Sequence, residues 1–118
     1  MLFNFRMFSI IAERAYQTIK GPVYSLDDAL SVFGYYFQAY EDTFREVRPN
    51  INAKQIASII ERMPCIDDLR GGSIDIYPTD YPVLIDQHFE TQYRNCDYNI
   101  NHFFSGDIRA LRYYEKLY

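Results

Sequence analysis

The stretch that decides the fold runs from residue 25 to residue 49 and reads SLDDALSVFGYYFQAYEDTFREVRP. Ser25 followed three residues later by Asp28 is typical of a helix start, because the serine oxygen can accept a hydrogen bond from a backbone N–H of the first turn. Apolar residues then recur alternately four and three positions apart, at Leu26, Leu30, Phe33, Phe37, Tyr40, Phe44 and Val47. This spacing predicts one long amphipathic helix that ends at Arg48-Pro49.

Helical signals continue on both sides of this stretch. A first helix is expected over about residues 4–19, where Gly21-Pro22 follows, and a third over 53–63, between an N-cap at Asn52 and Pro64. A fourth helix is expected over about residues 80–93, and a last one after Ser105 as its N-cap. We therefore predict a mainly α fold, a compact bundle of about five helices.

Two short segments alternate in the manner of strands. Ile74 and Ile76 follow a turn signal at Gly71-Gly72, and the alternation returns at Tyr98, Ile100, His102 and Phe104. Pairing of residues 74–77 with residues 98–104 would add one small β-hairpin or ribbon to the helices. The prediction is a helical bundle with or without this hairpin.

Length and composition describe an ordinary globular chain. It has 118 residues, of which 48% are hydrophobic and 24% charged, and this balance excludes disorder. Without a repeat or a linker-like tract, a single helical domain over residues 1–118 is expected. The apolar start MLFNFRMFSII is interrupted by Arg6 and too short for a membrane span, so a cytoplasmic protein with Cys65 and Cys96 as free thiols is expected.

The net charge of −4 argues against a general nucleic-acid binder. Acidic residues concentrate in residues 64–97, where Arg70 and Arg94 are outnumbered by Asp67, Asp68, Asp75, Asp80, Asp86, Glu90 and Asp97. The simpler interpretation of this run is a solvated face that keeps the protein soluble. The alternative interpretation is an electrostatic docking surface for a basic partner.

Basic residues on two helices are the candidates for a nucleic-acid or protein contact. Lys54 and Arg62 belong to a row spaced by four on residues 53–63, opposite the apolar face, although Glu61 shares their surface. Near the end of the chain, Ile108, Leu111 and Tyr114 are expected to pack inward. The outer face of this last helix would then carry Arg109, Arg112, Tyr113 and Lys116. Tyrosine with arginine is the composition of protein-interface hot spots and of stacking platforms for single-stranded nucleic acid.

The sequence contains no catalytic, cofactor-binding or metal-binding motif that would indicate an enzyme. The chain contains no nucleotide-binding glycine loop and no GxSxG, and its Cys and His spacings match no metal site. His88 and His102 are interpreted as structural or solvent-facing. A nucleophilic Cys–His pair would require proximity in the fold, which a sequence does not reveal. We expect no catalytic residue, no cofactor and no metal.

Two strings, YSLDDALSVFGYYFQAYE and DYNINHFFSGDIRALRYYEKLY, resemble small uncharacterised bacterial proteins of the kind carried on mobile elements. The resemblance spans most of the chain and implies an accessory role in bacteria, either DNA-related or protein-binding. It implies no activity and no functional residue.

The aromatic content is the strongest functional hint, with 12 Tyr and 9 Phe and no Trp. The core of a chain of this size needs fewer aromatic rings than this, so some of the rings are expected on the surface. The sequence therefore favours a non-enzymatic interaction module that binds a protein partner or itself through a Tyr-rich surface. The alternative is a nucleic-acid-binding accessory protein that uses the basic residues.

Overall fold

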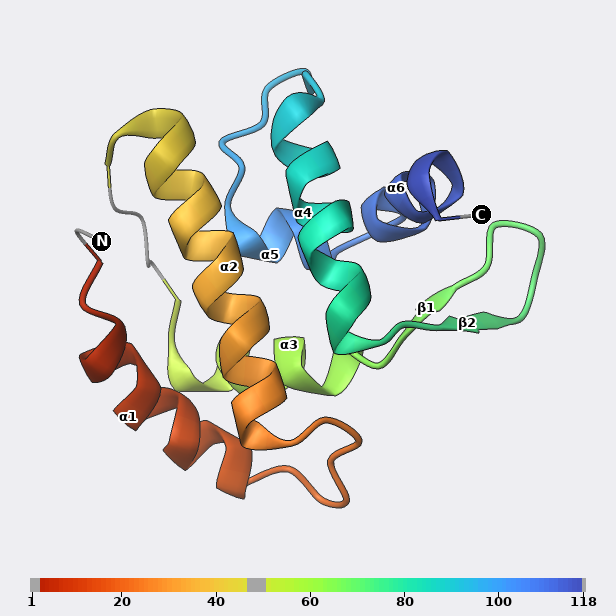
Figure 1. Cartoon of the computed structure of the whole chain (residues 1–118). Helices are drawn as coiled ribbons and strands as arrows, with labels where there is room; N and C mark the ends of the chain where they lie inside the picture. Colours follow the sequence, from red (N-terminus) through yellow and green to blue (C-terminus); the bar gives the residue numbers. More distant parts are fainter. Residues whose placement is uncertain (1–2, 47–50, 118) are drawn as a thin grey trace.

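Residues 3–46 and 51–117 are described by the structure, a computed structural model, and most of them lie in helices (Figure 1). The helices are α1 (Phe5–Gln17), α2 (Leu26–Phe44), α3 (Ala53–Arg62), α4 (Tyr81–Glu90), α5 (Ile100–Phe104) and α6 (Ile108–Lys116). A short hairpin of β1 (Cys65–Asp67) and β2 (Ser73–Asp75) leads through the 3-10 turn η1 (Pro78–Asp80) into α4. The predicted fold class, a mainly helical globule with one short hairpin, is confirmed.

The two helices α2 and α4 lie side by side in the middle of the molecule (Figure 1). Helix α1 packs on α3 and against α2 on one side, while α6 packs against α4 and α5 on the other. The hairpin projects from the globule beside α6 (Figure 1). This arrangement buries one continuous core between all the helices.

The central helix follows the predicted stripe over most of its length. The Ser25 Oγ accepts a hydrogen bond from the Asp28 N–H at 3.1 Å, as the cap signal indicated. Phe33 and Phe37 of the stripe are buried, whereas Phe44 at the end of the helix is 39% exposed. The helix ends there because Arg45 adopts a left-handed conformation with φ of 59°. Val47 and the predicted helix end at Arg48-Pro49 lie outside the described residues.

A close contact between α1 and α2 explains the glycine within α2. A Cβ built on Gly34 would lie 3.3 Å from the Phe5 Cζ, which is tighter than an ordinary carbon–carbon contact. The absence of a side chain at this position therefore lets the Phe5 ring of α1 pack directly on the α2 backbone.

Buried tyrosines fasten loops to the helices. The Tyr24 hydroxyl donates to the Ile76 carbonyl oxygen at 2.5 Å, and the Tyr81 hydroxyl donates to the Met63 carbonyl oxygen at 2.7 Å. Burial raises the pKa of Tyr24, and it raises that of Tyr81 to about 12 in spite of the nearby Arg109. These buried hydroxyls thus donate hydrogen bonds to backbone carbonyl oxygens in the core.

The hairpin uses different strands from those predicted. Ile66 pairs with Ile74 in an antiparallel register, and the predicted turn at Gly71 and Gly72 connects the two strands with φ of 103° and 83°. Residues 98–104 are instead a loop followed by α5. This prediction was wrong because the Asn99 side chain accepts the Asn101 N–H at 2.8 Å and starts a helix, an effect that outweighs a short alternation.

The start of the last helix also differs from the prediction. Ser105 ends α5, where its hydroxyl donates to the His102 carbonyl oxygen at 3.0 Å, and α6 begins after Asp107.

Within residues 3–46 and 51–117, none of these helices combines the length and the apolar character that crossing a membrane requires.

Candidate functional site

The basic residues singled out by the sequence do not form one face. Lys54 and Arg62 on α3 and Lys116 at the end of α6 are exposed, and Tyr113 is half-buried. Arg109 and Arg112, expected on the outer face of α6, are buried with 7% and 6% of their surface exposed. The predicted orientation of the last helix is therefore wrong, because each guanidinium finds hydrogen-bond acceptors inside the protein.

Arg109 joins α6 to the end of α3. Its Nη1 donates to the Arg62 carbonyl oxygen at 2.8 Å and to the Tyr81 hydroxyl at 3.1 Å. The guanidinium also lies over the Phe104 ring, 4.9 Å from its centroid. Carbonyl groups in the last turn of a helix have no partner within that helix, and Arg109 satisfies one of them.

Arg112 joins α6 to the segment that follows α4. Its Nη1 donates to the Thr91 hydroxyl at 2.8 Å and to the Tyr93 hydroxyl at 3.0 Å, and its Nη2 is paired with Glu115 at 2.9 Å. Both buried arginines therefore hold the fold together, and neither is available to a ligand. The candidate basic residues that remain at the surface are Lys54 and Arg62 on α3 and Lys116 at the end of α6.

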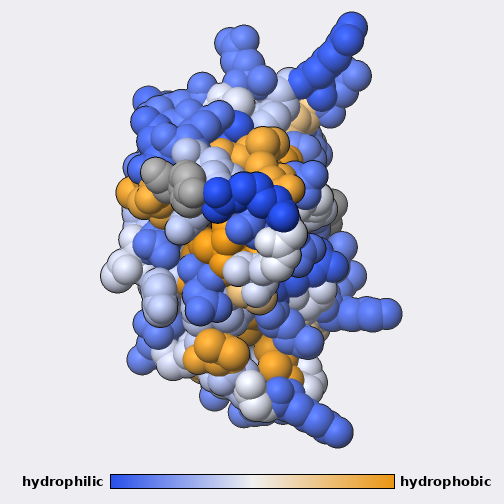
Figure 2. Space-filling model, turned by 90° about the vertical axis from the view of Figure 1, so that its right-hand side faces the viewer, coloured by the Kyte–Doolittle hydropathy of each residue, from blue (hydrophilic) through white to orange (hydrophobic). Residues whose placement is uncertain are grey.

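Apolar side chains on the face that bears α6 and the hairpin are scattered. Leu111, expected in the core, is 43% exposed there, and Leu69 at the hairpin is 46% exposed. Figure 2 shows the hydrophobic residues of this face as small groups between hydrophilic residues. On this face, the described residues form no continuous apolar patch of the kind that marks many protein interfaces.

Most of the aromatic residues lie in the core. Among the described residues, the exposed rings are Tyr77 at 63%, Phe44 at 39% and Tyr35 at 37%. The expected surface aromatics are therefore few, because tyrosines such as Tyr24 and Tyr81 use their hydroxyls inside the protein. Two of the three exposed rings, Tyr35 and Phe44, belong to α2.

A cleft of about 330 Å³ lies between α2 and α4 beside Tyr35. We call it the α2–α4 cleft, and its lining residues are Tyr35, Gln38, Ala39, Asp42, Thr43, Asp86, Phe89 and Glu90. Three of these residues are acidic and exposed, and none is basic. Asp86 and Glu90 are one turn apart on α4, where two like charges repel one another by roughly 0.2–0.5 kcal/mol.

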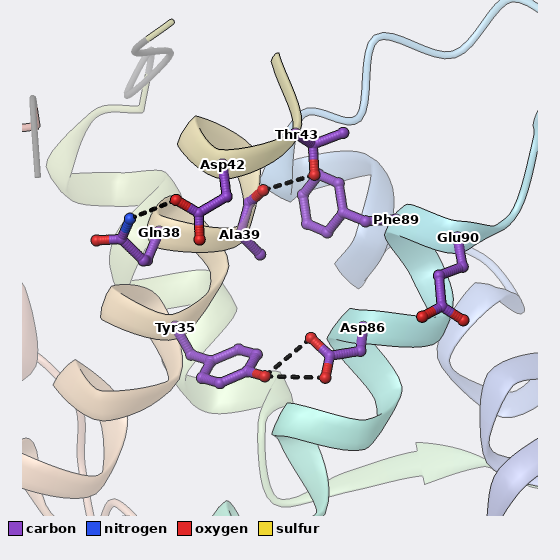
Figure 3. Close-up of a pocket in the computed structure, with 8 residues that line it drawn as sticks. All are labelled: Tyr35, Gln38, Ala39, Asp42, Thr43, Asp86, Phe89 and Glu90. Atoms are coloured by element: carbon purple, nitrogen blue, oxygen red, sulfur yellow. Dashed lines mark hydrogen bonds between the residues drawn. The ribbon is translucent and has the colours of Figure 1, made fainter. Parts of the chain in front are cut away.

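The two walls of the cleft are joined by one side-chain contact. The Tyr35 hydroxyl of α2 lies 2.8 Å and 2.9 Å from the two carboxylate oxygens of Asp86 on α4, and it donates its proton to this group (Figure 3). Burial, and then the hydrogen bond to Asp86, raise the pKa of Tyr35. On the α2 wall, the Gln38 amide donates to the Asp42 carboxylate at 2.8 Å.

The inner surface of the cleft is apolar. Ala39 and Phe89 are partly buried against the core, and Figure 3 shows the Phe89 ring directed from α4 toward α2. The Phe89 ring is held by Tyr36 at 5.0 Å and by Tyr98 at 5.7 Å between centroids. Carboxylates around an apolar surface match a lysine or arginine side chain, which carries an aliphatic stem below its charge.

Sequence reasoning found part of this cleft. Asp86 and Glu90 belong to the acidic run over residues 64–97, for which a basic partner was one interpretation. The contribution of α2 was missed, since Tyr35 and Asp42 lie more than forty positions away from their neighbours on α4 and only the packing of the helices joins them. The run itself is divided, because Asp67 and Asp75 lie on the hairpin and away from the cleft.

No candidate metal site is present among residues 3–46 and 51–117, since no group of three or more His, Cys, Asp or Glu side chains there could hold an ion.

Comparison with protein-family models, with curated proteins and with solved structures found no match.

Proposed function

We propose that this protein is a non-enzymatic interaction module that binds a basic segment of a partner protein in the α2–α4 cleft. The observation that carries the proposal is the presence of three exposed carboxylates, from Asp42, Asp86 and Glu90, around a partly buried apolar surface. A lysine or arginine in the cleft would place its stem on Ala39 and Phe89 and its charge among the carboxylates. It would also relieve the repulsion between Asp86 and Glu90.

A protein segment suits the cleft better than a small amine. A volume of about 330 Å³ lies at the lower end of the range for small-molecule pockets and accommodates one or two side chains. Further binding energy must come from the surrounding surface, where Tyr35 and Phe44 are exposed. Tyrosine is enriched among the residues that dominate protein interfaces.

A second copy of the chain is a poor occupant of the same cleft. A symmetric dimer would bring the three carboxylates of one copy against those of the other, and the net charge of −4 adds to this repulsion. The partner is therefore a different, basic protein. A cytoplasmic location is part of the proposal and is supported by the two free thiols.

The test uses a fluorescently labelled oligoarginine peptide and measures its binding by fluorescence anisotropy at about 0.1 M salt. We expect the double variant D86N/E90Q to bind the peptide about tenfold more weakly, since each exposed ion pair contributes roughly 0.2–1 kcal/mol and each 1.4 kcal/mol corresponds to a factor of ten. The matched control is D67N/D75N, which removes the same charge from exposed positions on the hairpin.

The control variant should lower the affinity less than about threefold, because charges beyond roughly 10 Å are screened at 0.1 M salt. Equal weakening by the two double variants would contradict the proposal, since it would show attraction to the net charge instead of binding in the cleft.

A further inference from the structure

The fold brings together a thiol and an imidazole that lie six positions apart in the sequence. The Cys96 Sγ, in the loop after α4, is 3.1 Å from the Nδ1 of His102 on α5. The backbone N–H of Tyr98 donates to the same sulfur at 3.2 Å. Both side chains are partly exposed, so a small reagent can reach them.

The loop that carries Cys96 is held in a strained conformation. Asn95 and Tyr98, on either side of the cysteine, have φ of 56° and 59°, in the left-handed region that favours glycine. The Tyr98 ring compensates by stacking on Phe89 with 5.7 Å between centroids, and its hydroxyl donates to the Thr91 carbonyl oxygen. Strain of this kind, maintained by surrounding contacts, is concentrated at functional sites.

A chain of hydrogen bonds beneath the pair fixes the position of the neighbouring histidine, His88. The Tyr36 hydroxyl donates to the Tyr98 carbonyl oxygen at 2.5 Å, so at 3.2 Å its oxygen accepts from the Nε2–H of His88. The Nδ1 of His88 then accepts from the Tyr93 hydroxyl at 3.0 Å, and that hydroxyl accepts from Arg112. Full burial lowers the pKa of His88 to about 3.

Because His88 is neutral, it adds no positive charge beside His102, although the two rings lie 6.1 Å apart. The tyrosines that face the pair, Tyr36, Tyr93 and Tyr98, carry no charge near neutral pH. The charged groups in and around the loop are Arg94 and Asp97 of the loop itself and Arg112 from α6. The imidazole of His102 is thus the group placed to exchange a proton with the sulfur.

We propose that Cys96 and His102 form a nucleophilic thiol–imidazole pair that reacts with low-molecular-weight disulfides. His102 Nδ1 takes the proton of the thiol, and the Cys96 thiolate attacks one sulfur of the disulfide RSSR. A Cys96–S–S–R bond forms as the S–S bond of the reagent breaks, and the leaving RS⁻ takes up the proton from the imidazolium. Cys96 is oxidised, and the departing sulfur is reduced to RSH.

The second cysteine of the chain is an internal reference. Cys65 is exposed on β1, whereas Cys96 is only partly exposed, so access alone would make Cys65 the faster thiol. A free thiol is only a few per cent thiolate at pH 7, whereas one ionised by an imidazole reacts faster at that pH. We therefore expect glutathione disulfide to modify Cys96 about tenfold faster than Cys65 near neutral pH.

The experiment treats the reduced full chain with glutathione disulfide near neutral pH, stops the reaction with acid, and quantifies each mixed disulfide by peptide mass spectrometry. Cys96 should be modified faster than Cys65. Modification of Cys96 at or below the rate of Cys65 would overturn the proposal.

The variant H102N removes the proton acceptor and should slow Cys96 to the rate of Cys65 or below, with Cys65 unchanged. Circular dichroism of the variant checks that it is folded. If it does not fold, the ratio of the Cys96 rate to the Cys65 rate in the unmodified chain still decides between the two outcomes. An unchanged Cys96 rate in folded H102N would also overturn the proposal.

Discussion

The hydroxyl of Tyr35 on α2 donates to the carboxylate of Asp86 on α4, and this contact joins the two walls of the α2–α4 cleft. It holds one carboxylate at the side of the cleft, with the phenol ring beside it. Glu90 and Asp42 complete the acidic surroundings from the same two helices. A basic ligand would therefore meet a carboxylate that is already oriented, which lowers the entropy lost on binding.

The variant Y35F tests this contact through the stability of the fold. It keeps the ring and removes the donor, so we expect a loss of about 0.5–1 kcal/mol in the free energy of unfolding, the usual net value of one hydrogen bond. Urea denaturation followed by circular dichroism measures the change. The control Y77F alters a tyrosine that is 63% exposed and should be nearly neutral. Equal effects of the two substitutions would argue against a stabilising Tyr35–Asp86 contact.

The second prediction concerns Arg109, which the structure places inside the protein. The variant R109A leaves the Arg62 carbonyl oxygen and the Tyr81 hydroxyl without this donor, and it also removes the packing on Phe104. We expect a loss of about 2–4 kcal/mol in the free energy of unfolding, typical of a broken buried network. The matched control K116A, at an exposed position on the same helix, should change it by less than about 0.5 kcal/mol. A loss no larger than that of K116A would contradict the buried position of Arg109.

The orientation of α6 could not be predicted from the sequence. The spacing of Ile108 and Leu111 favoured an apolar inner face, and charged residues are almost never buried unless they are paired. The acceptors that make burial favourable belong to α3 and to the segment after α4, and no local pattern reveals them. By contrast, the caps at Ser25 and Asn52 were predicted correctly, because the groups they bond lie three residues away.

The same distinction explains what was found of the cleft and of the thiol pair. The one-turn spacing of Asp86 and Glu90 can be seen in the sequence, whereas their proximity to Tyr35 depends on how α2 and α4 pack. Cys96 and His102 are close in sequence, but residues six positions apart do not share a face of a helix, and on an extended strand they would lie about 20 Å apart. Their contact depends on the left-handed backbone conformations of Asn95 and Tyr98, and the residue types alone do not predict this pair of conformations.

The third prediction concerns acid sensitivity. The pKa of His88 is about 3 in the folded protein, below the ordinary value of about 6.5 in the unfolded chain, so the unfolded chain binds the extra proton. The stabilising contribution of neutral His88 is complete above about pH 6.5 and is lost at up to about 1.4 kcal/mol per pH unit as the pH falls toward 3.

Urea denaturation at several pH values between neutral and acid measures this slope. The variant H88Q cannot take up the proton and should show a flatter dependence than the unmodified chain, whatever its absolute stability. The variant H102N should keep the slope, because His88 is unchanged. An equal slope in the unmodified chain and in H88Q would show that His88 does not determine the acid sensitivity.

The fourth prediction addresses nucleic acid, the alternative function. With Arg109 and Arg112 buried, the described basic candidates left at the surface are Lys54, Arg62 and Lys116, and the net charge is −4. We expect no measurable binding of single- or double-stranded DNA at physiological salt, since duplex binding loses affinity with a salt slope of about −0.9 per phosphate contact and few contacts are available. Tight binding by fluorescence anisotropy that K54A/R62A abolishes would favour the alternative.

The central claim is that a basic segment binds between α2 and α4, and the most direct measurement is a titration of the isotope-labelled protein with an oligoarginine peptide, followed by NMR. The proposed function requires the largest changes in chemical shift at the amides of Tyr35, Asp42, Asp86, Phe89 and Glu90, with a single saturating transition that D86N/E90Q weakens. Shifts centred on Asp67 and Asp75 of the hairpin, or spread over all exposed acidic residues without saturation, would contradict it.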